Sequence, residues 1–145
     1  METIRELLDS KGTDVWSVDP STSVLDALQI MADKNIGALL VMDPSAELLG
    51  IFSERDYARK IVLQGKRSKD TKVVDIMTKR VVCVHPDQGI RDCMALITRE
   101  RVRHLPVIDD GHILGVVSIG DIVKSIIDNQ DLLIRQLEHY IAGSL

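Results

Sequence analysis

Aromatic residues are scarce in this chain of 145 residues, which has one tryptophan, one phenylalanine and two tyrosines. This composition predicts an aliphatic core and disfavours a nucleic-acid site built on stacking platforms. Two cysteines, Cys83 and Cys93, are too few for a disulfide framework. No apolar run reaches the roughly 18 residues of a membrane span, and the first residues lack the basic segment and apolar core of a signal peptide. We therefore expect a cytoplasmic protein that does not enter the membrane.

Charge is distributed unevenly, although 45% hydrophobic and 28% charged residues describe an ordinary soluble globular protein. The net charge of −4 disfavours a general polyanion-binding protein. Residues 59–80 nevertheless hold eight basic side chains against two acidic ones, Asp70 and Asp75. This stretch is either a solvated linker or a surface that attracts phosphates. Its basic members are Arg59, Lys60, Lys66, Arg67, Lys69, Lys72, Lys79 and Arg80.

The sequence contains two copies of one unit. A shift of 66 residues aligns Val18-Asp19-Pro20 with Val84-His85-Pro86, and a later shift of 65 aligns the segment 50–53 with 115–118. A single slip of one residue separates the two shifts. The predicted organisation is an N-terminal helix in residues 1–12, a first repeat in 13–65, a basic linker in 66–74, a second repeat in 75–128 and a C-terminal helix in 129–145.

Each copy has the same predicted order of elements, which is strand, helix, strand, strand, helix. The first copy places them at 15–18, 23–34, 38–42, 48–52 and after Ser53, and the second at 81–84, 88–100, 104–108, 113–118 and after Ser118. This order predicts an α/β fold with a mixed sheet and helices on one face. Because residues 36–42 are nearly all apolar, we expect the strand at 38–42 to be central and buried on both faces.

Both ends of the chain carry apolar stripes at helical spacing. The first predicts a short amphipathic helix in residues 2–10, and the second lies in residues 131–141. A dimer contact, or a clasp over the other repeat, would bury the second stripe. The stripes consist of Ile4, Leu7 and Leu8 near the N-terminus, and of Leu133, Leu137, Tyr140 and Ile141 near the C-terminus.

The motif Gly-x-x-Ser-x-x-Asp ends the third predicted strand of each copy. Serine and aspartate have the spacing of a helix capping box, in which the serine hydroxyl accepts from a first-turn backbone N–H. An aspartate in the first turn also complements the helix dipole. The glycine lets another group approach the backbone closely. Helix capping and ligand binding are both open for this motif, which comprises Gly50, Ser53 and Asp56 in one copy and Gly115, Ser118 and Asp121 in the other.

In this pattern the chain resembles the CBS domain pair, or Bateman module, of the stand-alone bacterial type. The resemblance covers residues 13–127. It rests on the segments Gly50–Tyr57 and Gly115–Ile122, on the segments 35–39 and 101–107 before them, on the two strand openings aligned above, and on Asp75–Thr78. It implies two tandem β-α-β-β-α repeats related by a pseudo-twofold axis. It also implies two clefts between the repeats that bind adenosine ligands, such as AMP, ADP, ATP, NAD or S-adenosylmethionine.

The resemblance also implies roles for individual residues. Asp56 and Asp121 match the aspartates that accept from ribose hydroxyls. The residues that would contact phosphate or ribose are Ser53, Arg55, Arg103 and Ser118. Adenine would lie against Val15, Trp16, Ile36, Gly37 and Ala38 in the cleft of Asp121, and against Thr78, Val82, Val102, Arg103 and His104 in the cleft of Asp56. The clefts are not equivalent, because Arg55 has Gly120 as its counterpart and Arg103 has Gly37.

We therefore expect a non-catalytic regulatory module, such as a sensor of energy state, that binds an adenine nucleotide or NAD. The expected protein partners are a second copy in a homodimer and an unidentified regulated protein. The alternatives are a ligand-free dimerisation or docking module and RNA binding through residues 59–80. We expect no metal and no nucleic-acid partner. No catalytic constellation emerges, because the chain has no Gly-x-x-x-x-Gly-Lys-Ser, Gly-x-Ser-x-Gly or Cys-x-x-Cys sequence.

Overall fold

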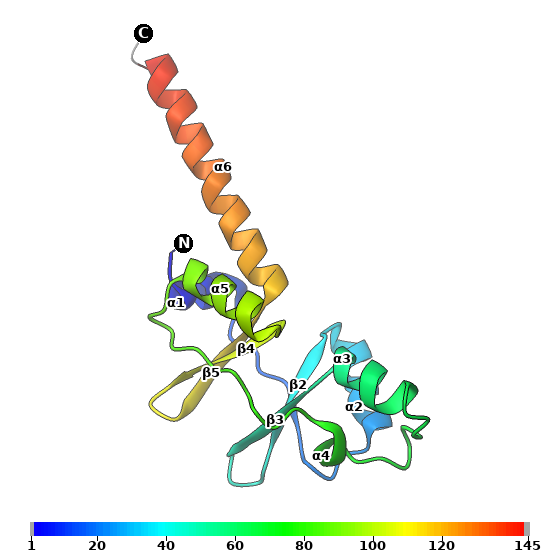
Figure 1. Cartoon of the computed structure of the whole chain (residues 1–145). Coiled ribbons are helices and arrows are strands. Elements are labelled where there is room, and N and C mark those ends of the chain that lie inside the picture. Colours follow the sequence, from blue (N-terminus) through cyan, green and yellow to red (C-terminus); the bar gives the residue numbers. More distant parts are fainter. Residues whose placement is uncertain (1, 144–145) are drawn as a thin grey trace. The chain divides into compact units, whose positions relative to one another are not determined.

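The chain folds into two compact units in the computed structural model, which describes residues 2–143 (Figure 1). Val15–Val81 forms one, the central unit. The residues before Val15 combine with those from Val82 onward to form the other, the terminal unit. The predicted linker and residues 75–81 of the predicted second repeat thus belong to the central unit, whereas the rest of that repeat shares its unit with the N-terminal helix.

A mixed three-stranded sheet in the order β1-β2-β3 forms the framework of the central unit. Strand β1 (Ser17–Val18) pairs in parallel with β2 (Ala38–Met42), and β2 pairs antiparallel with β3 (Leu48–Ser53). The strand expected at 15–18 is therefore shorter than predicted. Strand β2 is central and its middle three residues are buried, which confirms the interpretation of its apolar sequence.

Helices complete the central unit. Helix α2 (Val24–Lys34) begins after Ser23, whose hydroxyl accepts from the N–H of Asp26, and ends at Asn35 in the left-handed conformation. After β3 the chain forms one turn of α3 (Glu54–Tyr57) and a π-helical turn (Ala58–Val62). Helix α4 (Val73–Ile76) begins inside the predicted linker of residues 66–74. The core is aliphatic apart from Phe52, as the composition predicts.

The terminal unit has a two-stranded antiparallel sheet of β4 (His104–Asp109) and β5 (His112–Ser118). Helix α5 (Ile90–Glu100) precedes it. The strand predicted at 81–84 was wrong, because only Val84 pairs in parallel with Val107. An extension of this ladder toward Val82 would require an N–H from Pro106, which proline lacks.

Helix α1 (Ile4–Lys11) lies where the sequence predicts an amphipathic helix, and its apolar face is buried in the terminal unit. Its start is bonded to the segment before α5. The N–H of Ile4 donates to the carbonyl of Gln88 at 3.0 Å, and the N–H of Ile90 donates to the carbonyl of Glu2 at 2.9 Å. A helix from the beginning of the chain is thereby fixed to the second repeat.

Helix α6 (Ile119–Gly143) is a single helix of 25 residues that combines the closing helix of the second repeat with the predicted C-terminal helix. Its buried residues, Ile122 and Ser125, lie in the first two turns. Every described residue from Gln130 onward is exposed, and Figure 1 shows this part extending away from α1 and α5.

Candidate functional site

Both Ser-x-x-Asp motifs lie where a strand passes directly into a helix, at the ends of β3 and β5. In the first, the N–H of Asp56 donates to Ser53 Oγ at 3.2 Å, and the N–H of Ser53 donates to Asp56 Oδ2 at 3.0 Å. In the second, the corresponding bonds between Asp121 and Ser118 measure 3.1 and 2.9 Å. Each motif is therefore a capping box that fixes its carboxylate at the helix start.

Asp56 has protein donors on both carboxylate oxygens. Beyond the capping bonds, its Oδ1 accepts from the Thr78 hydroxyl at 3.0 Å and lies 3.0 Å from the Lys60 ammonium. Lys60 also donates to the carbonyl of Ile76 at 2.9 Å. The Asp56 side chain is only 8% exposed. Burial with a full set of partners is typical of a structural carboxylate.

Asp121 has partners on only one oxygen. Its Oδ2 accepts from the Ser118 N–H and, at 2.7 Å, from the ammonium of Lys11, which also donates to the carbonyl of Val116 at 2.7 Å. No donor among residues 2–143 contacts Oδ1, and the side chain is 27% exposed. Burial opposes the charge of Asp121, but the hydrogen bonds from Lys11 and Ser118 outweigh it and lower the pKa of this carboxyl.

The two motif glycines are in close contact with protein groups. A Cβ at Gly50 would lie 2.6 Å from Met77 Sδ and 2.8 Å from the carbonyl oxygen of Thr78. A Cβ at Gly115 would lie 2.8 Å from a methyl group of Leu8. The close approach that the sequence predicts is thus made by the segment 77–78 in one unit and by α1 in the other.

Gly37 and Arg103 occupy equivalent positions, as the repeat alignment predicts. Each carbonyl accepts from the first N–H of the closing helix, Glu54 N–H at 3.1 Å and Ile119 N–H at 2.8 Å. Arg103 therefore lies beside the start of α6 in the terminal unit. Arg55 is exposed on α3.

Thr78, one of the residues predicted to contact adenine, donates its hydroxyl to the motif aspartate Asp56. Trp16 is 38% exposed, and the ammonium of Lys34 lies 4.3 Å from its ring centroid. The rest of each predicted adenine pocket combines residues of both units, and these two pockets stay predictions. They join Asp121 with Val15, Trp16, Ile36, Gly37 and Ala38, and Asp56 with Val82, Val102, Arg103 and His104.

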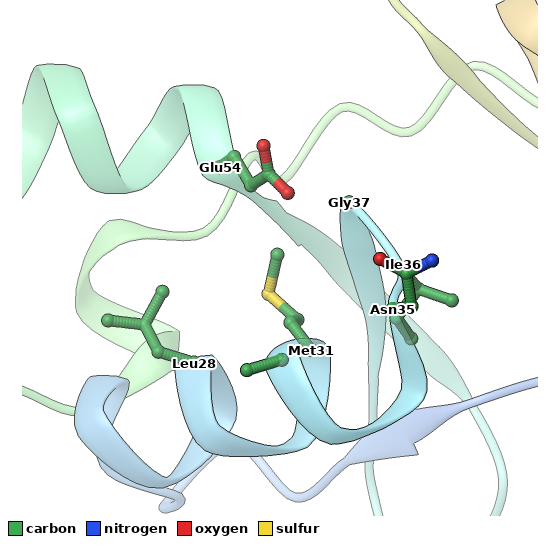
Figure 2. Close-up of a pocket in the computed structure, with 7 residues that line it drawn as sticks. Leu28, Met31, Asn35, Ile36, Gly37 and Glu54 are labelled. Carbon is green, nitrogen blue, oxygen red and sulfur yellow. The ribbon is translucent and has the colours of Figure 1, made fainter.

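Ile36 and Gly37, which are predicted to contact adenine, line a pocket of about 310 Å³ in the central unit (Figure 2). Met31 points from α2 toward Glu54, and Gly37 lies at the start of β2. The other residues that line the pocket are Leu28, Ala32 and Asn35. An apolar floor beside one carboxylate suits an uncharged or cationic group better than a phosphate.

Sequence reasoning missed both lysines that neutralise the motif aspartates. The sequence contains a signal for the Lys60 contact, because Lys60 follows Asp56 by four residues and the two therefore share one helical face. Lys11 had none, since 110 residues separate it from Asp121.

The basic stretch is partly neutralised within the central unit. Lys60 is bonded to Asp56 and Ile76, and Arg67 pairs with Asp70 at 3.3 Å.

In the described part of the chain, no three His, Cys, Asp or Glu side chains gather as a metal site. No helix between residues 2 and 143 has the length and hydropathy to cross a membrane.

Comparison with known proteins identifies the family. The CBS domain model matches residues 4–63 and 73–128, so the chain belongs to the CBS domain family and carries two CBS domains. A protein with CBS domains from Burkholderia ambifaria has a structure similar to this chain, with a TM-score of 0.85 and 49% identity over 88% of this chain and 96% of that one.

More distant relatives extend the comparison. The CBS domain-containing protein CBSX3, mitochondrial, of Arabidopsis thaliana is 41% identical over 97% of this chain and 72% of its own length. The CBS domain pair of protein MJ0100 was solved with 5'-methylthioadenosine and S-adenosyl-L-methionine. It has a TM-score of 0.76 and 23% identity, and the match covers 88% of this chain and 97% of that one. That likeness shows the shared fold.

Proposed function

We propose that this protein is a non-catalytic regulatory module that binds an adenosine-containing ligand through Asp121, and that Asp56 is structural. The observation that carries the proposal is the unequal engagement of the two carboxylates. Asp56 is buried with donors on both oxygens, whereas Asp121 is partly exposed and has one oxygen with no donor in the described chain.

A ribose fits the acceptor that Asp121 offers. Two vicinal hydroxyls are donors, and an ionised carboxylate accepts from both of them. The capping bonds and Lys11 already orient the carboxylate, so a ligand would not have to order it. Gly120, next to Asp121, leaves space at the helix start, because an added Cβ would meet only Ser118 Oγ at 3.6 Å.

The surroundings of Asp121 also favour an anionic group near the ribose. Helix α6 presents its N-terminal N–H groups there. Lys11 uses two of its three N–H donors on Asp121 and Val116. A protein of the same fold was solved with two adenosine compounds, which supports a search among AMP, ADP, ATP, NAD and S-adenosylmethionine.

The test is a thermal-shift screen of these five compounds on protein shown by mass spectrometry to be ligand-free. A ligand at about 100 times its Kd adds about 2.7 kcal/mol of stability, which corresponds to a rise in Tm of roughly 5–10 °C for a chain of this size. The best ligand is then compared with its 2'-deoxy analogue. Loss of one hydroxyl donor to a charged acceptor should weaken binding about tenfold or more.

Two results would contradict the proposal. If none of the five compounds raises the Tm, a ligand-free docking module becomes the better interpretation. If the 2'-deoxy analogue binds equally well, the carboxylate does not accept from the 2'-hydroxyl, and the proposed contact with both ribose hydroxyls is wrong. The regulated partner and a cytoplasmic location stay predictions.

A further inference from the structure

Beyond its first turn, α6 carries a seam of mostly apolar residues whose apolar members are exposed. Its members lie at alternating intervals of four and three residues, which is the heptad spacing of a coiled coil. Ile134 and Leu137, in its centre, are 52% and 53% exposed. The seam consists of Val123, Ile127, Gln130, Ile134, Leu137 and Ile141.

The residues that flank the seam differ on its two sides. One side is apolar and consists of the exposed Leu133 and Tyr140 and of Ile126, which is partly buried against the core of the terminal unit. The other is charged and consists of Lys124, Asp131 and Glu138. Lys124 and Glu138 have no ion-pair partner among residues 2–143. This division determines how two such helices would fit together.

We propose that this face of α6 binds the same face of a second copy of the chain as an antiparallel coiled coil. In a parallel pair, the charged side of one helix would face the apolar side of the other, so Glu138 would lie against Leu133. In an antiparallel pair, like sides meet. Leu133 would then pack on Leu133 of the other copy. Lys124 of each copy would lie opposite Glu138 of the other, and these two attractions outnumber the one contact between the two Asp131 side chains at the centre.

The size of the seam suits a stable dimer. It spans 19 residues of α6, or about 28 Å of helix. The apolar members of the seam and of its apolar side are half-exposed on average. They expose roughly 600–800 Å² per copy, and a partner that covered most of this area would approach the value of about 800 Å² per partner for a standard interface. Ile134 and Leu137, at the centre of the seam, come 13 and 16 residues after Asp121 on α6, so the contact between copies does not require a bound ligand.

The first test removes the seam while keeping charge matched. Ile134→Glu with Leu137→Glu is compared with Gln136→Glu and His139→Glu, two exposed residues outside the seam. Sedimentation equilibrium measures the dimer Kd, and thermal unfolding verifies the fold of each variant. We expect the seam variant to raise Kd at least about 100-fold and the control less than about threefold.

The second test reports the orientation of the helices. Lys124→Glu and Glu138→Lys each turn two attractions into repulsions and should raise Kd roughly tenfold. The double variant should restore the wild-type Kd, because the pairs are reversed but complementary. In a parallel pair these residues would lie about 21 Å apart along the axis and no restoration would occur. A monomeric wild type, a Kd insensitive to the seam variant, or an unrestored double variant would each overturn the proposal.

Discussion

Replacement of each motif aspartate by asparagine should separate the structural carboxylate from the ligand-binding one. Asparagine has nearly the same volume and keeps one carbonyl oxygen for the N–H of the capping serine. The two sites differ in what the new NH2 group meets. At position 56 it faces the Thr78 hydroxyl and the Lys60 ammonium, which are both donors to Asp56 Oδ1. At position 121 it takes the place of Oδ1, which has no donor in the described chain.

The expected losses of stability follow from these contacts. At position 56, a buried acceptor of charge-assisted bonds is lost, and partial exposure of Lys60 reduces the cost to about 2–3 kcal/mol. That loss corresponds to a Tm lower by roughly 6–12 °C for a chain of this length. At position 121 the remaining oxygen still accepts from Ser118 and Lys11, so only the partly exposed ion pair is lost. Its loss costs about 0.5–1 kcal/mol.

Differential scanning calorimetry of the ligand-free variants and titration calorimetry with the best ligand together form the assay. Asp121→Asn should weaken binding about tenfold or more with little change in Tm, whereas Asp56→Asn should lower Tm and change affinity less than about threefold. Lys60→Met, added to Asp56→Asn, removes the opposed donor and should recover part of the lost stability. Equal losses of stability at both positions, or loss of affinity only at position 56, would refute the reasoning.

Three further results are expected. Gly50→Ala should cost about 2–3 kcal/mol in urea unfolding and Gly115→Ala about 1, because the first Cβ would meet a rigid carbonyl oxygen and the second a leucine methyl that moves. Lys11→Met should lower the free energy of unfolding most at pH values above the unfolded pKa of Asp121, near 3.9. This deficit should vanish as the pH falls through the lowered pKa of Asp121 in the folded protein. Urea unfolding at a series of pH values measures both limits. Burial raises the pKa of Cys93 to about 11, with a smaller contribution from a neighbouring carboxylate, so iodoacetamide at pH 8 should modify this thiol only after unfolding. Rapid labelling of Cys93 in the native protein, distinguished from labelling of the exposed Cys83 by peptide mass spectrometry, would contradict this.

Much of the fold is predictable because the repeat supplies each element twice. The two antiparallel strand pairs were placed to within one residue, since apolar runs bounded by turn residues determine them locally. The errors arose where long-range hydrogen bonding decides the outcome. The strand at 81–84 failed because Pro106, far along the chain, lacks the required N–H. The division of α6 had no local basis, since neither glycine nor proline occurs between Asp121 and Ala142.

The candidate site was predictable as a motif and not as a chemical environment. Ser53 with Asp56 and Ser118 with Asp121 look alike in sequence, and both pairs form capping boxes. The difference between them comes from Lys11, which reaches Asp121 from the far end of the chain. No periodicity or local spacing reports such a contact.

Fixing α1 to the second repeat has a consequence during protein synthesis. The ribosome makes α1 before the central unit, yet β4, β5 and the start of α6, against which Leu7 and Leu8 are buried, emerge last. At about 5–20 residues per second, the delay between α1 and the start of α6 is roughly 5–20 s. The central unit is complete in the nascent chain well before that. The first helix in the sequence is therefore among the last to pack, and its apolar face is accessible to chaperones in the interval.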